Sequence, residues 1–274
     1  IDSPDVSAVA DQSALKVEAG STQTVRLHRG YVHVGYAAGF DPTSGSTGKY
    51  KNLTADNMYQ LVSNKTDLDA ITILGGLGKN YMLRNDIDYA DATHASIGTN
   101  AAPFTGKFDG MFHEIKNMTV AAGTATDYAG LFGNTEGAEI MNVGIRDANL
   151  STVDYGGAVV GKAGKGTHIS AVYNEVTDIV PAATKTVGKA GAHAAGGIAG
   201  TLDGGTAESD VVTLDNAYNT APIAEQAAGI AGSIQGTSRV YAVYNTGALQ
   251  HSAARAVYKG LAGSSFIKDS YTTQ

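Results

Sequence analysis

One six-residue pattern recurs from residue 115 to the C-terminus, and it constrains the fold more than any other feature. Its copies are 25 to 29 residues apart, except for one interval of 45 residues between positions 169 and 214. A repeat of this length is typical of solenoids, in which each copy packs against its neighbours. The copies are Ile115-Lys-Asn-Met-Thr-Val120, Ile140-Met-Asn-Val-Gly-Ile145, Ile169-Ser-Ala-Val-Tyr-Asn174, Leu214-Asp-Asn-Ala-Tyr-Asn219, Val240-Tyr-Ala-Val-Tyr-Asn245 and Ile267-Lys-Asp-Ser-Tyr-Thr272.

The positions within this pattern predict a strand that bends. The first position is always Ile, Leu or Val and the second is mostly polar, which is the alternation of a strand. The fourth position is again mostly apolar, although positions one and four face opposite sides of a straight strand. We therefore predict a corner at the third position, where four copies carry a residue that tolerates the left-handed conformation. These residues are Asn117, Asn142, Asn216 and Asp269.

The fifth position is tyrosine in the last four copies: Tyr173, Tyr218, Tyr244 and Tyr271. Stacked coils would place these side chains in a ladder. The ladder could be an interior stack that supports the fold, which we favour, or an exposed stripe that binds a glycan. The chain has 14 Tyr, 6 Phe and no Trp, and a tyrosine ring can lie flat on a sugar while its hydroxyl group forms a hydrogen bond.

Composition excludes several classes of function. With 35 Gly in 274 residues, the chain favours tight turns over helices. Its 19 basic and 26 acidic side chains give a net charge of −7, which repels a phosphate backbone, so no nucleic-acid partner is expected. The absence of Cys removes disulfides, thiolate nucleophiles and Cys-based metal sites. No apolar run reaches the length of a spanning helix, so we expect no membrane insertion of this segment.

The N-terminal part differs from the rest. Residues 1–55 lack the repeat, and their alternating apolar residues predict three short antiparallel strands around 15–17, 25–27 and 32–34. Such a β-rich segment could cap the end of a solenoid. Within residues 56–78, the spacing of Met58, Leu61 and Val62 predicts a turn of helix. A second turn is expected to be capped near Thr66 and to bury Leu68 and Ile71.

A family resemblance becomes visible between residues 81 and 133. The successive motifs are Tyr-x-Leu-x-Asn-Asp-Ile-Asp (81–88), Ser-Ile-Gly (96–98), Phe-Thr-Gly-x-Phe-Asp-Gly-x-x-His-x-Ile-x-Asn-Met-Thr-Val (104–120) and Gly-Leu-Phe-Gly (130–133). The last of these recurs with variations at 157–161, 197–200, 229–232 and 260–263. Over residues 56–274 the chain resembles the GLUG-type repeat region of large bacterial surface exoproteins such as filamentous-haemagglutinin-like adhesins.

This resemblance implies a right-handed parallel β-helix over residues 56–274, which agrees with the strand and corner deduced from the repeat. Coils stacked about 4.8 Å apart would make six coils roughly 30 Å long. The long interval predicts a surface insertion within residues 175–212, and insertions on solenoids often carry a binding surface. A tolerated excursion without a ligand is the simpler interpretation.

Candidates for catalysis or metal binding are weak. Asp86, Asp88 and Asp91 could form a carboxylate cluster, but a strand-end turn rich in Asp accounts for them equally well. His28 and His33 flank a turn without a third ligand, and the chain has no calcium-loop, nucleophile-elbow or phosphate-loop motif of correct spacing. We therefore predict no catalytic residue, no metal and no cofactor, and expect a protein that is not an enzyme.

Four Asn-x-Ser/Thr sequons are candidates for glycosylation: Asn52, Asn64, Asn117 and Asn149. Sequons also arise by chance in a chain rich in Asn and Thr. Asn117 moreover occupies a predicted corner position, which gives it a structural role as well.

The function expected from these features is that of a segment of a secreted or cell-surface bacterial adhesin. It would serve as a β-helical scaffold and contact a host-cell surface protein or glycan. The lack of an initial Met suggests a piece of a longer chain. Two alternatives stay open: a non-catalytic module of a secreted protease or polysaccharide-degrading enzyme, and a glycan-binding segment that uses its Tyr side chains.

Overall fold

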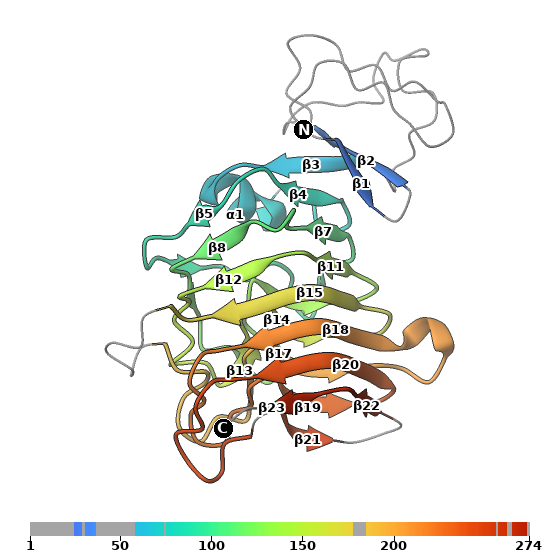
Figure 1. Ribbon diagram of the computed structural model, residues 1–274. Coiled ribbons are helices and arrows are strands. Elements are labelled where there is room, and N and C mark those ends of the chain that lie inside the picture. Colours follow the sequence, from blue (N-terminus) through green and yellow to red (C-terminus); the bar gives the residue numbers. More distant parts are fainter. Residues whose placement is uncertain are drawn as a thin grey trace, which may run out of the picture.

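The chain forms a right-handed parallel β-solenoid of about six turns, whose coils succeed one another from the N-terminal to the C-terminal end (Figure 1). The computed structural model describes residues 25–28, 31–36, 58–73, 75–177, 185–255, 257–261 and 265–272. In this described part every strand pairing is parallel except that of the first two strands, which form an antiparallel hairpin. The predicted fold class is confirmed.

Most strands belong to one long sheet, called the front sheet here because its strands cross the front of Figure 1. From β4 onward, each coil contributes either two short strands separated by a corner or one long strand that runs through the corner. Its members are β1 (Val25–His28), β2 (Tyr31–Tyr36), β3 (Met58–Val62), β4 (Tyr81–Leu83), β5 (Ile87–Asp88), β7 (Lys107–Asp109), β8 (Glu114–Lys116), β11 (Glu139–Met141), β12 (Gly144–Arg146), β15 (His168–Glu175), β18 (Val212–Asn219), β20 (Ser238–Asn245), β22 (Phe266–Lys268) and β23 (Tyr271–Thr272).

A second sheet, the back sheet, closes the opposite side of the coils. It consists of β10 (Phe132–Thr135), β14 (Val160–Ala163), β17 (Ala199–Asp203), β19 (Ala231–Gln235) and β21 (Tyr258–Leu261). Two small sheets complete the turns: β6 (Thr93–His94) with β9 (Thr119–Val120), and β13 (Tyr155–Gly157) with β16 (Ala194–Gly196). The described helical elements are α1 (Lys65–Ile73) and a short 3-10 turn at Glu208–Asp210.

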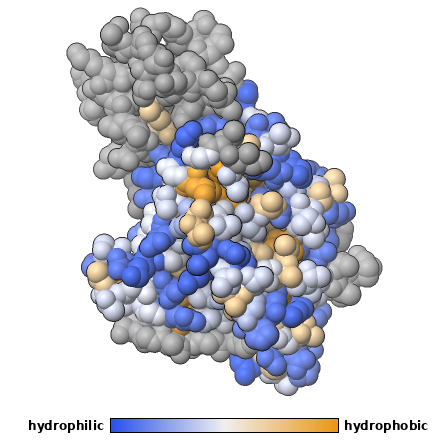
Figure 2. Space-filling view, turned by 180° about the vertical axis from the view of Figure 1, so that it is seen from behind, coloured by the Kyte–Doolittle hydropathy of each residue, from blue (hydrophilic) through white to orange (hydrophobic). Residues whose placement is uncertain are grey.

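The core is a column of apolar side chains enclosed by these sheets. Ile140, Ile169, Leu214 and Val240, at the first position of the repeat, are all at most 1% exposed. Each such side chain contributes about 1.5–3 kcal/mol when fully buried. Seen from behind, most visible atoms of described residues are hydrophilic or neutral, and the apolar ones form small separate patches (Figure 2).

The register corrects the first copy of the repeat. Ile140 pairs with Phe108 in the preceding coil, whereas Ile115 pairs with Ile145 beyond the corner. The predicted copy beginning at Ile115 was therefore wrong: Phe108 occupies the first position in this coil, and Ile115 lies after the corner. Two bulky residues with positive φ, Met111 and Phe112, lengthen the corner of this coil and hide the repeat from sequence alignment.

The same check applies to the glycine motif of the back sheet. In the last coil, Gly260 pairs with Ser233 rather than with the first glycine of the preceding motif, so the predicted copy at 260–263 is out of register. The second glycine of the earlier motifs has a clear function. A side chain at Gly133 or Gly200 would collide with the backbone of the neighbouring segment, which packs directly against these strands.

The predicted corner at the third position is confirmed. Positive φ angles of 51° to 55° occur at this position in every copy from residue 140 onward, at Asn142, Ala171, Asn216, Ala242 and Asp269. Asn117, with φ 53°, forms the next corner along its coil, equivalent to Asp147. Alanine adopts the same angle although the left-handed conformation costs it about 1–2 kcal/mol. Stacking between coils therefore imposes the corner even where the residue does not favour it.

A ladder of buried asparagines follows the corner. Asn174, Asn219 and Asn245, at the sixth position, are each 0% exposed. The Nδ2 group of Asn174 donates to Oδ1 of Asn219 at 2.8 Å, and Nδ2 of Asn219 donates to Oδ1 of Asn245 at 2.7 Å. Nδ2 of Asn219 also donates to the carbonyl of Ala221 at 2.9 Å. These bonds join three successive coils inside the core, where an unpaired polar group would be costly.

The N-terminal end of the core is closed by α1. Leu68 and Ile71 face inward and are buried, as predicted. The helix cap is Asn64, whose Oδ1 accepts the N–H of Asp67 at 3.0 Å, rather than the predicted Thr66. The predicted helical turn at Met58–Val62 was wrong, because these residues form β3, which pairs with β2 and β4.

The N-terminal segment contributes β1 and β2, which extend the front sheet beyond β3. They correspond to two of the three predicted strands, and the third lies outside the described residues. The interval within 175–212 is not one excursion, because β16 and β17 in its middle pair with β13 and β14 as ordinary coil strands. The additional length lies on either side of them.

We expect Asn219→Ala to lower the free energy of unfolding by about 3 kcal/mol. It removes the partners of Asn174 Nδ2, Asn245 Oδ1 and the Ala221 carbonyl, and each unsatisfied buried group costs about 1–3 kcal/mol. Asn216→Ala is the matched control, because Ala171 and Ala242 already occupy the same corner; it should cost about 1 kcal/mol or less. Urea denaturation measures both, and equal losses would contradict a special role of the ladder.

Candidate functional site: the tyrosine face

The predicted tyrosines lie on the outward side of the front sheet, so the favoured interior position of the stack was wrong. Tyr173 on β15, Tyr218 on β18 and Tyr244 on β20 pair in register on successive coils, and each is half-buried. Tyr271 on β23 pairs with Tyr244 in the last coil. We call the surface formed by Tyr173, Tyr218, Tyr244 and the polar residues that contact them the tyrosine face.

The rings form a parallel stack. The centroids of Tyr173 and Tyr218 are 5.0 Å apart with 7° between the ring planes, and those of Tyr218 and Tyr244 are 5.1 Å apart with 9° between the planes. Each ring therefore covers a face of its neighbour. What the stack presents outward is ring edges and hydroxyl groups, rather than the flat aromatic surface on which a sugar ring packs.

The stack leans toward the N-terminal coils because glycine makes room for it. At the same position β12 has Gly144, and a Cβ atom added there would overlap the ring of Tyr173. The Tyr173 hydroxyl reaches across Gly144 and donates to Oε1 of Glu114 on β8 at 2.7 Å. In the same way the Tyr218 hydroxyl donates to Oε2 of Glu175 at 3.2 Å.

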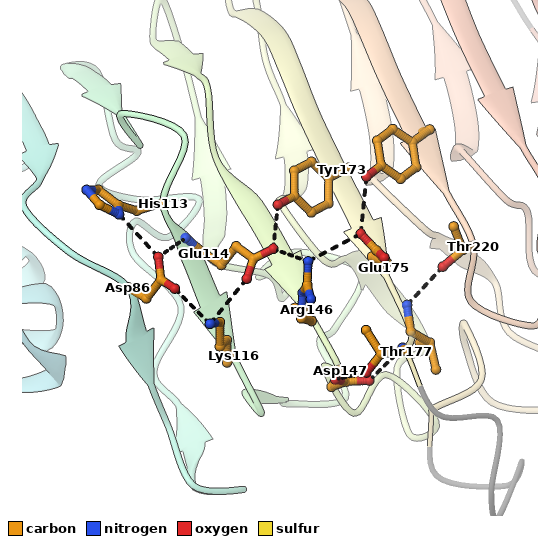
Figure 3. Close-up of polar contacts among 12 residues, drawn as sticks. Asp86, His113, Glu114, Lys116, Arg146, Asp147, Tyr173, Glu175, Thr177 and Thr220 are labelled. Carbon is orange, nitrogen blue, oxygen red and sulfur yellow. Dashed lines mark hydrogen bonds and ion pairs between the residues drawn. The ribbon is translucent and has the colours of Figure 1, made fainter.

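These carboxylates belong to a network of alternating charges that crosses four coils (Figure 3). Lys116 Nζ lies 2.7 Å from Oδ2 of Asp86 and 3.3 Å from Oε2 of Glu114. Arg146 contacts Glu114 as well and lies 3.6 Å from Oε2 of Glu175. Every one of these five charged groups therefore has an oppositely charged neighbour.

The network shifts the pKa values of its members. The hydrogen bond from Lys116 is the main cause that lowers the pKa of Asp86 to about 2, and the Glu114 N–H and His113 Nδ1, 3.1 Å away, act in the same direction. Burial raises the pKa of the Tyr173 hydroxyl to about 12, and its hydrogen bond to Glu114 adds to the effect. The lowered pKa keeps Asp86 ionised as an acceptor, and the raised pKa keeps the Tyr173 hydroxyl protonated as a donor.

The polar groups of this arrangement are ordered by hydrogen bonds and ion pairs with one another. The carboxylates form ion pairs with Lys116 and Arg146, and the Tyr173 and Tyr218 hydroxyl groups donate hydrogen bonds to two of these carboxylates. In the described residues no group of three or more His, Asp and Glu side chains is placed to hold a metal ion. The tyrosine face therefore consists of side chains that are ordered by their contacts with one another.

The acidic residues considered as a cluster have separate structural contacts. Asp86 belongs to the charge network, and Asp88 accepts hydrogen bonds from Nδ2 of Asn117 at 3.0 Å and from the N–H of Ala90 at 2.8 Å. Asp91 lies at the corner with φ 64°. Asp86 and Asp88 therefore connect this coil to the next one, through Lys116 and Asn117.

The sequons differ in their surroundings. Asn64 caps α1 and donates to Asp67 at 3.1 Å, and Asn117 donates to Asp88. Asn149 accepts from the N–H and hydroxyl of Ser151, at 3.1 Å and 2.8 Å. Asn52 lies outside the described residues. Three of the four candidates thus have a local structural role, and their glycosylation stays a prediction.

A second aromatic row was missed by sequence reasoning. The rings of Tyr128 and Tyr155 meet edge to face with centroids 5.5 Å apart, and Tyr155 stacks on His193 at 5.2 Å with 4° between the planes. Asp154 fixes the His193 ring through Nδ1 at 2.9 Å. Tyr128 and Tyr155 share a position, because each lies two residues before the first glycine of its motif and the adjacent Ala129 and Gly156 pair between coils. His193 lies one residue before Ala194, the partner of Tyr155, so only the fold brings His193 to this row.

The back sheet has a shallow hollow of about 180 Å³. Lys162 and Asp203, which form a 2.8 Å ion pair, are among its lining residues, with Asn134 and Lys165. Pockets for organic ligands usually enclose about 300–1,000 Å³ and are largely apolar. The small size and paired charges of this hollow do not favour it as a ligand site.

Comparison with known proteins gives one partial likeness. No family model matches the chain, and no solved structure matches it. Halomucin of Haloquadratum walsbyi is 36% identical over 118 residues, which cover 40% of this chain and 1% of that protein. The match thus spans less than half of this chain and a very small part of the length of Halomucin. The likeness and the solenoid fold are compatible with an extracellular or surface location. In the described part no helix is long and apolar enough to cross a membrane.

We expect Gly144→Ala to destabilise the protein by about 1–3 kcal/mol, because the new methyl group forces the Tyr173 ring away from Glu114. The same substitution in a Tyr173→Ala background should cost less than about 1 kcal/mol, since no ring remains to be displaced. A double-mutant cycle by chemical denaturation measures the coupling. Equal costs in both backgrounds would contradict the packing described here.

Alkaline pH should weaken the contacts of the tyrosine stack. Because the folded pKa of Tyr173 is raised to about 12 from an ordinary value of about 10, its contribution is complete below pH 10 and is lost as the pH rises toward 12. We expect the free energy of unfolding to fall over this range, and to fall less steeply in Tyr173→Phe and Glu114→Gln. Denaturation at stepped pH values tests this, and identical slopes in all three proteins would refute it.

Proposed function

We propose that the chain is a segment of a microbial cell-surface adhesin, in which the solenoid is a rigid scaffold and the tyrosine face contacts a partner. The observation that carries the proposal is the stack of Tyr173, Tyr218 and Tyr244, whose rings are held parallel on three coils of a continuous sheet. Side chains that are already ordered lose little entropy on binding, and tyrosine is enriched at the centres of protein interfaces.

The chemistry of the face favours a partner that forms hydrogen bonds and packs against ring edges. Neighbouring rings cover the faces of the stack, so it lacks the open aromatic platform expected of a glycan site. The charge network is internally paired, so strong electrostatic attraction of a partner is not expected. A host-cell surface protein accordingly fits better than a glycan, which is the second candidate.

The alternative of a non-catalytic module in a secreted enzyme uses the same scaffold. It differs in that the tyrosine face would contact another domain of its own chain. The likeness to 1% of Halomucin supports a place within a long surface protein, but does not discriminate between the two roles.

Attachment of the purified segment tests the proposal. The probes are cultured epithelial cells, surfaces coated with fibronectin or collagen, and a glycan array. We expect binding to cells or a coated protein that falls at least about tenfold in Tyr218→Ala/Tyr244→Ala, because removal of central anchors typically costs over 1.4 kcal/mol. Lys162→Ala, on the back sheet, is the control and should bind normally.

The outcomes separate the candidates. Binding confined to the glycan array and lost in the tyrosine variant would support the glycan site instead. No attachment to any of these surfaces, or attachment that does not depend on the tyrosines, would refute the adhesin proposal for this face.

A further inference from the structure

A buried polar cluster at the N-terminal end has no part in the tyrosine face. It joins three elements: Asp69 on α1, Tyr89 directly after β5, and His94 on β6. The His94 side chain is fully buried, Tyr89 is 2% exposed, and the Asp69 side chain is 28% exposed. Ionisable groups in such positions require well-placed partners.

The distances define a chain of hydrogen bonds. Oδ1 of Asp69 lies 2.8 Å from the Tyr89 hydroxyl oxygen, which lies 2.7 Å from Nδ1 of His94. Nε2 of His94 is 2.9 Å from the carbonyl oxygen of Leu131. Nδ1 of His94 is also 3.4 Å from Oδ1 of Asp69, so the imidazole and the carboxylate are close neighbours.

Counting protons shows that a neutral histidine cannot satisfy this chain. A carbonyl oxygen only accepts, so Nε2 of His94 must carry a proton for Leu131. The two remaining contacts, from Asp69 to Tyr89 and from Tyr89 to His94, need one proton each. The Tyr89 hydroxyl supplies only one of them, so either the carboxyl group or Nδ1 must hold another.

The carboxyl group is the less favourable place for that proton. Lys65 Nζ lies 2.6 Å from Oδ2 of Asp69 and favours the anion. The bond with His94, followed by those with Lys65 and Tyr89, holds the pKa of Asp69 well below its usual range despite partial burial. Nδ1 of His94 is therefore the place that completes the chain, and it makes the ring an imidazolium.

We propose that His94 is doubly protonated in the folded protein and that the Asp69–Tyr89–His94 cluster is a pH-sensitive fastening that holds α1 over the N-terminal end of the core. The helix side chains that depend on it are Leu68 and Ile71, both of which are buried. Because solenoid ends need covering, this fastening controls access to the end of the core.

The direction of the pH effect follows from the same count. Loss of the Nδ1 proton leaves Tyr89 with one hydrogen for two acceptors, so either Asp69 or His94 loses its donor and α1 is held less firmly as the pH rises. Strong acid, which protonates Asp69, also weakens the charge pair. The fastening is therefore strongest from moderately acidic to neutral pH.

Few other ionisable groups face the cluster among the described residues. Lys65 contacts Asp69 and lies 5.0 Å above the Tyr89 ring. On the other sides β9 pairs with β6 through the apolar Val120, and the 129–131 segment contributes a backbone carbonyl. The charge of His94 is thus opposed by Asp69, with Lys65 completing the set.

Ring ¹⁵N NMR of the whole protein with labelled histidine tests the protonation state. At pH 7.5 a free imidazole, with a pKa of about 6.5, is mostly neutral. We expect both nitrogens of His94 to show the shifts and bonded protons of an imidazolium at this pH. A bare Nδ1 at pH 7.5 would overturn the proposal.

Hydrogen exchange of the α1 amides, corrected for intrinsic rates, tests the fastening. We expect protection at Leu68 and Ile71 to fall roughly tenfold or more between pH 6 and pH 9, because the single hydrogen of the Tyr89 hydroxyl then leaves one of its two buried acceptors without a donor. Tyr89→Phe should remove most of this pH dependence. Tyr81→Phe is the matched control, since it deletes another buried hydroxyl at the same end, which donates to Gly76, and should retain the dependence. Protection that is independent of pH in the wild type, or an unchanged dependence in Tyr89→Phe, would overturn it.

Discussion

Stacking of coils in register is the constraint on which the rest of the structure depends. Each residue faces the residue at the same position of the next coil, about 4.8 Å away. Like side chains therefore meet, which suits rings and amides: Tyr173 stacks on Tyr218, and Asn219 bonds to Asn174 and Asn245. The same rule places Lys116 beside Arg146, where two like charges repel each other. Two carboxylates resolve that conflict: Glu114, two residues before Lys116, and Glu175, which occupies the same position as Arg146 on the next coil.

This arrangement has a consequence for recognition. A face whose charges neutralise one another exerts little long-range attraction, so a partner must gain its affinity from close contact. The stacked tyrosines suit this requirement, because their positions are fixed by neighbours on both sides. The rigidity that removes the open ring faces also reduces the entropy lost on binding.

The sequence predicted what repeats, and it failed where the repeat is interrupted. The solenoid, the left-handed corner and the tyrosine ladder followed from recurring positions. The coil of β7 and β8 was misaligned because Met111 and Phe112 lengthen its corner, so Ile115 was assigned to the wrong side of that corner. The asparagine ladder was visible as Asn at the sixth position of three copies, but its burial and bonding depend on the register. The His94 cluster could not be predicted, because Asp69, Tyr89 and His94 lie in three elements with no common period.

The two ends of the solenoid are built on different principles. On β15, β18 and β20 the fifth and sixth positions hold Tyr and Asn, whereas β8 and β12 have Glu114 or Gly144 followed by an isoleucine. Identical side chains join the coils at one end, and unlike groups joined by specific hydrogen bonds close the other. In a solenoid each coil interacts mainly with its neighbours, so the stability of one end depends little on the other. The tyrosine face can therefore vary in sequence without loosening α1, and a change in the protonation of His94 can act on α1 without disturbing the stack of rings.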